Sequence, residues 1–394
     1  MQRFGCPGFQ TAGVCAGLKK DGACDLGLIF AEAPASLAGV FTRNRVQAAP
    51  VQLSRRRAAA GTCRAVVVNS KNANCCTGAQ GMTDALALTA MVARELQVDE
   101  ELVLAASTGV IGAPMPMDRL GAAVPILVRS LAAGDVSSLA QSIMTTDTVP
   151  KAERRQVAVD GKTLTLVGVA KGAGMIRPDM ATMLCFVMSD VQAAPADLQT
   201  ALGQAVDRSF NRISIDGDTS TNDTCLLMAS GVSGVRLDSS EVRDAFQSAL
   251  DELLTELARQ LVADGEGVTK VVTVNVRGAA SDADAGRVAD VVAHSPLVKT
   301  AFFGQDANWG RILAAAGRSG VPFDPERASL FFDGVQMVAG GIGLGAEAER
   351  DATAVLRKEA FTVTLDLGAG PGRATMLTCD FSLDYVKINA DYRS

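Results

Sequence analysis

Histidine is almost absent from this sequence, which contains a single one, His294, among 394 residues. A zinc site of the Cys₂His₂ or His₃ type therefore cannot be assembled, and we expect no metal. A serine–histidine–aspartate triad would depend on this one side chain. We interpret His294 as a structural or loop residue, since a satisfied histidine in the core is the ordinary case. If the protein is an enzyme that uses a general base, the base is expected to be another group.

Other absences exclude further classes of protein. The formal net charge is −6 and no dense run of basic residues is present, which argues against a nucleic-acid-binding surface. No apolar stretch approaches the length of a membrane span, and the first ten residues, MQRFGCPGFQ, contain no apolar signal region. The nine cysteines are odd in number and none are spaced C-x-x-C. This pattern favours a reduced, cytoplasmic compartment over a disulfide framework.

The length and the composition of the chain predict a folded protein of two domains. The chain is longer than the roughly 250–300 residues at which a single core stops growing. It is 48% hydrophobic and 20% charged, as expected of a globular protein. The β-branched run Cys63–Ser70 predicts a buried strand. Val157–Leu166 and Leu330–Val338 each contain a central Asp-Gly pair, which predicts two hairpins.

Helices are predicted between these strands. Thr83 is a candidate cap for a helix over Asp84–Leu96, and Ser239 or Ser240 for a helix over Glu241–Val262. The small and polar stretch Arg277–Arg287 is the best candidate for a linker. One face of the second helix is apolar, and its members are Val242, Phe246, Leu250, Leu253, Leu257 and Leu261.

Several loops are rich in hydroxyl side chains. They are the STG of Ser107–Gly109, the TTDT of Thr145–Thr148, the long loop Ser214–Thr224, and a Gly- and Pro-rich loop that ends at Thr182. Each alone is most simply a set of side-chain-to-backbone turns. Together they suggest a hydroxyl nucleophile that works without a triad. A threonine can do so when its own α-amino group is free to accept the hydroxyl proton, which requires a break between Ala181 and Thr182.

Nine segments, in order along nearly the whole chain, resemble the family of ornithine acetyltransferases (glutamate N-acetyltransferases), the bifunctional proteins of arginine biosynthesis. They are GVFTRNRVQAAPV, NSKNANCCTGAQG, STGVIG, MTTDTVPK, KGAGMIRPDMATML, SIDGDTSTNDT, DGEGVTK, SPLVKTAFFGQDANWGRI and DYVKINADYRS. The resemblance implies an α/β fold of layered sheets and helices in two domains, of the DmpA-like or ornithine-acetyltransferase-like kind. We assign residues 1–280 to a catalytic domain and residues 281–394 to a smaller α/β domain that completes the substrate site.

The family precursor cuts itself before a threonine, and the new amino-terminal threonine becomes the nucleophile. In this sequence the cut lies between Ala181 and Thr182, and it gives an α chain of residues 1–181 and a β chain of residues 182–394. The resemblance implies that Thr108 and Gly109 form the oxyanion hole. The substrate-binding positions that it implies are Thr148, Lys171, Thr182, Glu266, Asn389 and Ser394.

Without the resemblance, several of these positions have plainer interpretations. Lys171 would be a solvated surface lysine, Glu266 part of a turn that ends a helix, and the carboxyl end a frayed terminus. Three positions depart from the family pattern. Asp179 replaces an asparagine, Ala307 a proline and Ser394 a terminal threonine. Asp179 is three residues from the nucleophile, so it leaves the cleavage rate and the substrate preference open.

The implied reaction is a ping-pong acetyl transfer. Thr182 takes the acetyl group from N²-acetylornithine, ornithine leaves, and glutamate accepts the acetyl group, with neither cofactor nor metal. Whether acetyl-CoA also serves as a donor is left open. The family's α and β chains associate as an α2β2 heterotetramer, and this protein is expected to do so in the cytoplasm.

Two other functions stay open on the sequence. A self-processing amidohydrolase, such as a β-peptidyl aminopeptidase, would expose its nucleophile in the same way but transfer the acyl group to water. A small-ligand-binding protein with threonine-rich loops would remain one intact chain.

Overall fold

The computed structural model describes residues 4–159, 161–177 and 183–391. The chain divides into two compact units. The first unit takes in the chain up to Asn211 and the stretch Asp218–Leu261, and the second takes in Arg212–Gly217 and Val262–Arg393. The second unit therefore contains residues on both sides of position 280, where the sequence suggested a domain boundary.

The first unit is built on an eight-stranded sheet in the described part of the chain, with the order β4-β3-β2-β8-β7-β6-β5 and with β1 paired to β2. The long strand β2 carries a register shift between Phe30 and Ala35. Its first part pairs with β1 and β3 and its last part with β8, so it belongs to both halves of the sheet. The strands are β1 Phe9–Val14, β2 Leu26–Phe41, β3 Thr62–Asn69, β4 Val103–Ser107, β5 Lys151–Val159, β6 Lys162–Lys171, β7 Leu184–Ser189 and β8 Thr224–Ala229.

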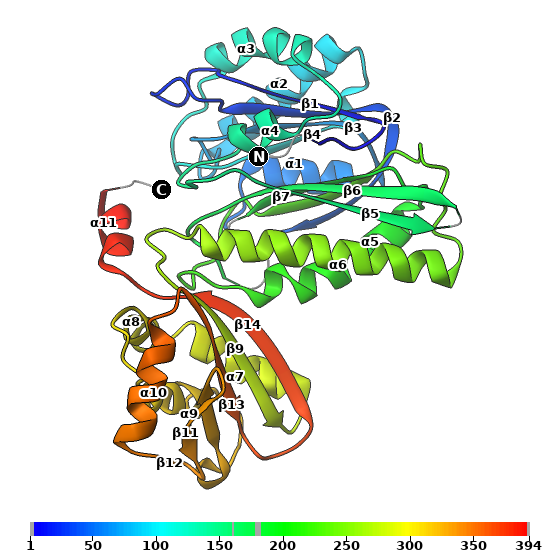
Figure 1. The fold of residues 1–394 in the computed structure, drawn as a ribbon. Coiled ribbons are helices and arrows are strands. Elements are labelled where there is room, and N and C mark those ends of the chain that lie inside the picture. The colour runs from blue at the N-terminus through cyan, green and yellow to red at the C-terminus, as the bar shows by residue number, and fades with distance from the viewer. Residues whose placement is uncertain (1–3, 160, 178–182, 392–394) are drawn as a thin grey trace. The chain divides into compact units, whose positions relative to one another are not determined.

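The two halves of this sheet face each other across one apolar core. Val66 and Leu104, from β3 and β4, share a buried cluster with Val169, Phe186 and Leu226, from β6, β7 and β8. Helices cover the outer faces, with α2 and α3 on one side and α5 and α6 on the other (Figure 1). The order of layers is therefore helix, sheet, sheet, helix. The helices of this unit are α1 Ala49–Ala58, α2 Gly78–Leu96, α3 Met117–Arg129, α4 Ser137–Ser142, α5 Pro195–Arg208 and α6 Ser240–Ala263.

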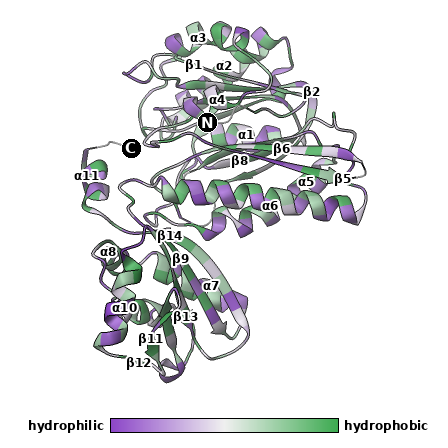
Figure 2. Ribbon diagram, in the orientation of Figure 1, coloured by the Kyte–Doolittle hydropathy of each residue, from purple (hydrophilic) through white to green (hydrophobic). Residues whose placement is uncertain are grey.

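Helix α6 confirms the predicted cap and the predicted apolar face. The Ser239 hydroxyl accepts a hydrogen bond from the Val242 N–H at 3.2 Å. Polar and apolar residues alternate along the ribbon of α6 (Figure 2). The inward side chains lie so close to β6 that a Cβ added at Gly168 would meet Leu253 and Leu257, each at 2.8 Å. All six predicted core residues are buried, namely Val242, Phe246, Leu250, Leu253, Leu257 and Leu261.

The predicted start of α2 is wrong. The helix begins at Gly78 rather than after Thr83, and the Thr83 hydroxyl donates to the carbonyl of Ala79 inside it. Gly81 is closely packed, since a Cβ there would lie 2.0 Å from the Thr77 hydroxyl oxygen. A side chain would not fit at this position, so the helix contains a glycine although glycine lowers helix propensity.

The predicted strand and both predicted hairpins are confirmed. Strand β3 covers the run from Cys63. In the first hairpin Val159 pairs with Lys162, and in the second Phe332 pairs with Val335. Asp333 of the second turn has a φ of +50°, the left-handed conformation that Asp-Gly turns favour.

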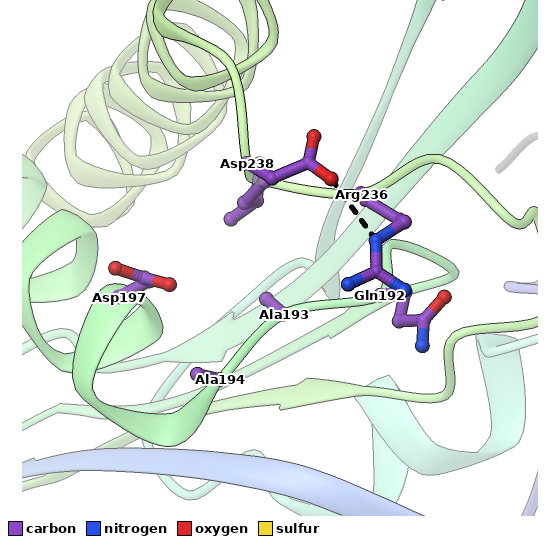
Figure 3. Close-up of a pocket in the computed structure, with 7 residues that line it drawn as sticks. Gln192, Ala193, Ala194, Asp197, Arg236 and Asp238 are labelled. Atoms are coloured by element: carbon purple, nitrogen blue, oxygen red, sulfur yellow. Dashed lines mark hydrogen bonds and ion pairs between the residues drawn. The ribbon is translucent and has the colours of Figure 1, made fainter.

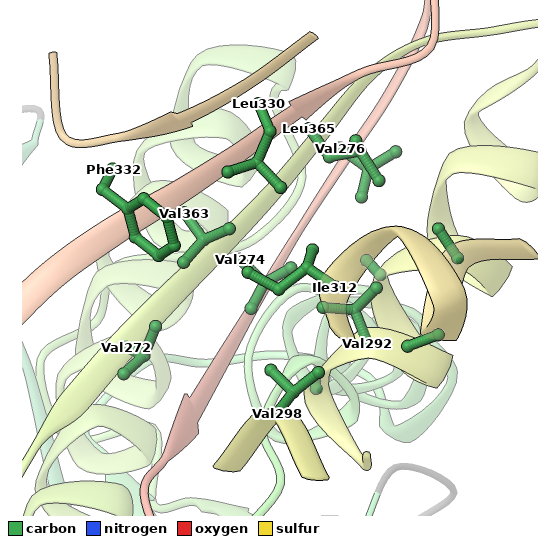
Figure 4. Packing of buried hydrophobic residues seen from close by; sticks show 14 of the residues in the cluster. Val272, Val274, Val276, Val292, Val298, Ile312, Leu330, Phe332, Val363 and Leu365 are labelled. Carbon is green, nitrogen blue, oxygen red and sulfur yellow. The ribbon is translucent and has the colours of Figure 1, made fainter. Parts of the chain in front are cut away.

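The second unit contains a six-stranded sheet within the described residues, in the order β12-β11-β10-β13-β9-β14. Side chains of the central strands point toward Val292, Val298 and Ile312 of the covering helices (Figure 4). The strands are β9 Val271–Ala279, β10 Ser329–Phe332, β11 Val335–Ala339, β12 Ile342–Gly343, β13 Ala360–Asp366 and β14 Gly372–Cys379. The helices are α7 Asp282–Ala293, α8 Pro296–Phe303, α9 Trp309–Gly317, α10 Ala346–Leu356 and α11 Leu383–Asp391.

The predicted linker at Arg277–Arg287 is wrong. It holds the end of β9 and the first turns of α7, which Ser281 caps by accepting a hydrogen bond from the Asp284 N–H at 3.1 Å. Small residues such as Ala285 are buried on this helix, so they serve packing rather than flexibility. Among the helices that the structure describes, none has the length and apolar character needed to cross a membrane.

Candidate active site

The candidate active site lies where the ends of several strands of the first unit meet. Lys171 ends β6 and pairs with Leu184, which begins β7 and pairs with Thr224, the first residue of β8. From the loop before β8, the Asn222 amide nitrogen donates to the carbonyl of Ser107, the last residue of β4, at 2.8 Å. Loops from both halves of the sheet are therefore joined at one place on a rigid scaffold.

Thr108 and Gly109 follow β4 and lie beside the loop after β3. The Thr108 N–H donates to the carbonyl of Asn69 at 3.0 Å, and the Val110 N–H donates to the carbonyl of Lys71 at 3.1 Å. No described residue accepts a hydrogen bond from the N–H between them, that of Gly109. The backbone of the predicted oxyanion-hole pair is therefore fixed on both sides of the Gly109 N–H, which has no acceptor in the part of the chain that the structure describes.

Only glycine fits at position 109. Its φ is +133°, and a Cβ there would lie 2.2 Å from the Lys71 carbonyl carbon and 2.5 Å from the Asn72 nitrogen. These are backbone atoms, which cannot move aside as a flexible side chain could. The glycine allows the two loops to approach each other closely.

Lys171 lies behind Thr108 and is 3% exposed, so the alternative interpretation as a solvated surface lysine is wrong. Its ammonium nitrogen donates to the Thr108 hydroxyl oxygen at 3.2 Å and to the Thr145 hydroxyl oxygen at 2.8 Å. A hydroxyl that accepts from an ammonium can direct its own hydrogen elsewhere. The Thr108 hydroxyl is therefore able to donate to a substrate oxygen.

Asp147 ties the Thr145 loop to the end of β6. Its carboxylate accepts hydrogen bonds from the Gly172 N–H at 2.7 Å, the Thr145 N–H at 3.0 Å and the Lys151 ammonium at 2.7 Å. Burial raises the pKa of this carboxyl, but the charges of Lys171 and Lys151 and these hydrogen bonds outweigh it and bring the pKa to about 2. Asp147 is therefore ionised at neutral pH, and it holds Lys151 in an ion pair at 2.7 Å.

Asp223 is a residue of the site that the sequence did not single out. It is a buried residue of the loop before β8 and contacts the start of β7, where one carboxyl oxygen, Oδ1, accepts a hydrogen bond from the Met183 N–H at 2.9 Å. The other, Oδ2, is buried and has no hydrogen-bond partner in the described part of the chain. Its position in the hydroxyl-rich loop Ser214–Thr224 was the available signal, but the prediction rested on the hydroxyls.

The remaining predicted site residues include three whose positions the structure does not describe. Ala181, Thr182 and Ser394 are not among the described residues. Thr148 is exposed, next to the buried Asp147. In the ranges that the structure covers, no three His, Cys, Asp or Glu side chains are grouped so that they could hold a metal ion.

Glu266 and Asn389, both in the second unit, are brought together by the fold. The Asn389 amide nitrogen donates to the Glu266 carboxylate at 2.8 Å. The turn that carries Glu266 packs closely on α11, since a Cβ at Gly267 would lie 2.3 Å from the Tyr385 nitrogen. The predicted substrate-binding glutamate and asparagine are thus neighbours, although the sequence separates them widely.

The comparison with protein families shows which family the chain belongs to. A model of the ArgJ family matches residues 10–394. The chain belongs to the ArgJ family. It is similar to the arginine biosynthesis bifunctional protein ArgJ of Geobacter sulfurreducens, at 54% identity over 98% of this chain and 99% of that protein. It is 52% identical to the protein of the same name from Syntrophotalea carbinolica, over 98% and 99% of the two chains.

A solved structure agrees with this membership. The crystal structure of the arginine biosynthesis bifunctional protein ArgJ of Bacillus halodurans matches at 40% identity and a TM-score of 0.50, over 52% of this chain and 98% of the solved chain. The predicted recognition and the predicted layered α/β fold class are thereby confirmed.

His294, the lone histidine of this ArgJ-family chain, is the C-cap residue of α7. Its Nδ1 lies 2.6 Å from the carbonyl oxygen of Asp290 and 3.2 Å from the carboxylate of the same residue. The side chain is 13% exposed. These contacts of Nδ1 lie within one helix end, and the other ring nitrogen, Nε2, is buried without a hydrogen-bond partner among the described residues.

A surface hollow of about 270 Å³ lies at the opposite end of β7 from the candidate site. Figure 3 shows its polar lining, in which Arg236 and Asp238 form an ion pair at 3.0 Å beside Gln192 and Asp197. It contains none of the predicted site residues, so the ArgJ-family chemistry is not assigned to it.

The close approach at Gly109 can be tested with two alanine variants. Both Gly109 and Gly112 have positive φ, but a Cβ at Gly112 would meet nothing within 4 Å. We expect Gly112→Ala to be destabilised only by the backbone conformation, by about 1–2 kcal/mol. Gly109→Ala should show a clearly larger fall in Tm in scanning calorimetry. Equal Tm values for the two variants would contradict the packing described for Gly109.

Proposed function

We propose that this chain transfers the acetyl group of N²-acetylornithine to glutamate through an acetyl ester on Thr182, after cutting itself between Ala181 and Thr182. As a member of the ArgJ family the chain is an acetyltransferase of arginine biosynthesis. The observation that carries the finer proposal is the group formed by Thr108, Gly109 and the buried Lys171 at the strand ends that lead to Met183.

The length of the solved relative supports the cut. The Bacillus halodurans chain matches over nearly all of its own length but over about half of this chain. A separate polypeptide of about half length is what cleavage between Ala181 and Thr182 would leave.

The oxyanion hole is proposed to act on both cleavage and acetyl transfer. In each case a threonine hydroxyl attacks a carbonyl carbon and negative charge develops on the carbonyl oxygen. The Thr108 hydroxyl and the Gly109 N–H are the donors proposed for that oxygen, and the Lys171 ammonium strengthens the Thr108 donor. Loss of a single donor of this kind typically lowers kcat by roughly 10²–10³-fold.

The proposed base is the α-amino group of Thr182. It takes the hydroxyl proton as the ester bond forms, and the proton then passes to the nitrogen of the leaving ornithine as the amide bond breaks. Glutamate reverses the sequence, because its amine attacks the acetyl ester and the proton returns to the Thr182 oxygen. Two half-reactions with one covalent intermediate give ping-pong kinetics.

Further parts of the proposal come from the resemblance. Thr148, Lys171, Glu266, Asn389 and Ser394 are proposed to bind the substrate, and the Glu266 carboxylate suits an amino-acid ammonium group. The α and β chains are proposed to form an α2β2 assembly in the cytoplasm. No cofactor or metal is proposed, and acetyl-CoA remains a possible second donor.

The self-cleavage is tested by changing the nucleophile. Freshly purified protein should run as two chains on a denaturing gel. Thr182→Ala should remain one chain of 40.8 kDa without acetyl-transfer activity, because it lacks the attacking hydroxyl. Thr182→Ser should still cut, since serine keeps that hydroxyl. Cleavage of Thr182→Ala at the same bond would rule out this role.

The substrate assignment is tested with purified components. Protein given N²-acetylornithine and glutamate should form N-acetylglutamate, and a chelator should leave the rate unchanged. With the donor alone, mass spectrometry of the β chain should find one acetyl group on Thr182. Free acetate as the sole product would instead indicate a hydrolase.

The identity of the base is tested by the pH profile of kcat/KM. An α-amino group titrates at roughly 7.7–8.0 when unperturbed, and the rate should rise as it loses its proton. His294→Gln should keep this rising limb even if Tm falls, because His294 is proposed to have only a structural role. Loss of the limb in a folded, cleaved variant would make the histidine the base.

A further inference from the structure

Two adjacent cysteines, Cys75 and Cys76, lie next to the candidate site, and the proposed mechanism does not use them. Their sulfur atoms are 3.8 Å apart. Cys75 is 1% exposed, whereas Cys76 is exposed, and both are free thiols. The fold therefore keeps one thiol that solvent can reach in contact with one that it shields.

The segment around this pair has an unusual backbone conformation. The φ angles of Lys71, Asn74 and Cys76 are +73°, +46° and +56°. Such left-handed conformations are uncommon in residues other than glycine, and they persist where the surrounding structure holds them. Here the Asn74 amide nitrogen donates to the carbonyl of Gly81 at 2.8 Å, and the Asn74 side-chain oxygen accepts from the Thr77 hydroxyl at 2.8 Å. The conformation of the pair is thus set by contacts on both sides of it.

The same segment supports the loop of the predicted oxyanion hole. The Val110 N–H donates to the carbonyl of Lys71 at 3.1 Å, and the Val110 carbonyl accepts from the Ala73 N–H at 3.0 Å. The Gly112 N–H donates to the carbonyl of Cys75 at 2.9 Å. Val110 and Gly112 directly follow the predicted oxyanion-hole pair, so the position of that pair depends on where the backbone of Cys75 lies.

We propose that Cys75 and Cys76 form a reversible thiol switch, in which oxidation by a peroxide joins the two sulfurs in a disulfide and lowers the rate of acetyl transfer. This inference goes beyond the proposed function, because the disulfide forms whichever acetyl donor the enzyme uses. In a reduced compartment, disulfides that form are typically transient and serve catalysis or redox sensing.

The two thiols have different parts in the oxidation. Burial raises the pKa of the Cys75 thiol, and although a hydrogen bond with the Thr221 hydroxyl opposes this, the pKa stays above its ordinary value. Since the thiolate is the reactive form of a cysteine, the exposed Cys76 reacts first. Its sulfur takes one oxygen of the peroxide and becomes a sulfenic acid, and the other oxygen leaves in a molecule of water.

The second step closes the disulfide. The Cys75 sulfur attacks the Cys76 sulfur, the S–S bond forms, the S–O bond breaks, and the hydroxyl leaves as water with the Cys75 proton. The two thiols together lose two electrons and two protons, and the peroxide is reduced to water. A dithiol reductant reverses the reaction by thiol–disulfide exchange.

Closing this bond must move the backbone. The sulfurs have to approach from 3.8 Å to about 2.0 Å. The resulting small ring contains the peptide unit between the two cysteines, so the Cys75 carbonyl turns with it and its hydrogen bond from Gly112 weakens. Adjacent Cα atoms are about 3.8 Å apart, closer than disulfides prefer. The bond is therefore strained and easily reduced, as a reversible switch requires.

The switch is tested by treating the cleaved enzyme with hydrogen peroxide, alkylating the remaining thiols and digesting with trypsin. Cleavage after Lys71 and Arg94 gives the peptide Asn72–Arg94, in which Cys75 and Cys76 are the only cysteines. We expect this peptide to lack two hydrogens and to resist alkylation until dithiothreitol is added. The kcat of the oxidised enzyme should be lower by about 100-fold and recover on reduction, since small displacements at a site have effects of this size.

A second measurement follows the loop without using activity. Hydrogen exchange at the Gly112 amide should be faster in the oxidised enzyme, because that amide loses its acceptor. Cys76→Ser should keep the untreated rate and become insensitive to peroxide. Cys15 is another exposed free thiol, so Cys15→Ser is the matched control and should lose activity on oxidation as the wild type does. Cys75→Ala provides the same test if Cys76→Ser fails to fold.

Three results would overturn the inference. One is oxidation of Cys76 to a sulfinic acid while Cys75 stays free. Another is a disulfide that leaves both kcat and the Gly112 exchange rate unchanged. The third is a Cys76→Ser variant that peroxide inactivates as fast as the wild type. Failure of the untreated wild type to form N-acetylglutamate would instead overturn the proposed function, and the mass and exchange measurements would still decide this inference.

Discussion

The pairing of β6, β7 and β8 is the constraint on which the candidate site depends. It sets Lys171, Leu184 and Thr224 in register on neighbouring strands. The loops before and after these residues must therefore meet at one edge of the sheet. Because these strands are buried on both faces, a slip of one residue would exchange the side chains that pack on the two faces and disrupt the packing of both. The register, and with it the site, is fixed by the packing of the whole unit.

The long strand β2, with its register shift between Phe30 and Ala35, also positions the candidate site. Since this strand belongs to both halves of the sheet, the end of β4 faces the loop before β8. The Asn222 side chain joins the two by donating to the carbonyls of Ser107 and Ala73. The backbone of Thr108 and Gly109 is thereby held by contacts that do not depend on a substrate. Such preorganisation is what an oxyanion hole requires.

Two buried carboxyls of the site have opposite electrostatic surroundings. Asp147 has two lysines and two backbone N–H groups around it, and its pKa falls to about 2. Asp223 accepts the Met183 N–H on Oδ1 and also interacts with the Ser220 hydroxyl and the Lys171 charge, but complete burial outweighs these and raises the pKa of its carboxyl. The first is a permanent structural anion. Burial favours the neutral form of the second.

The sequence by itself determined the elements whose signals are local. The Asp-Gly turns, the strand at Cys63 and the apolar face of α6 follow from the conformational preferences of neighbouring residues and from helical periodicity. Its ordered motifs also identified the family, and they predicted Thr108 and Gly109 as an oxyanion-hole pair. The small and polar stretch at Arg277–Arg287 misled the linker prediction, because small residues also suit a packed helix.

Only the tertiary structure decided which side chains meet. The contact of Lys171 with Thr108 joins residues 63 apart, that of Asp223 with Met183 joins residues 40 apart, and that of Asn389 with Glu266 joins residues 123 apart. Burial, and with it the raised pKa of Asp223 and the depressed pKa of Asp147, likewise depends on neighbours from other strands. No local pattern encodes such contacts, because they exist only once the strands have paired and water has left the space between them.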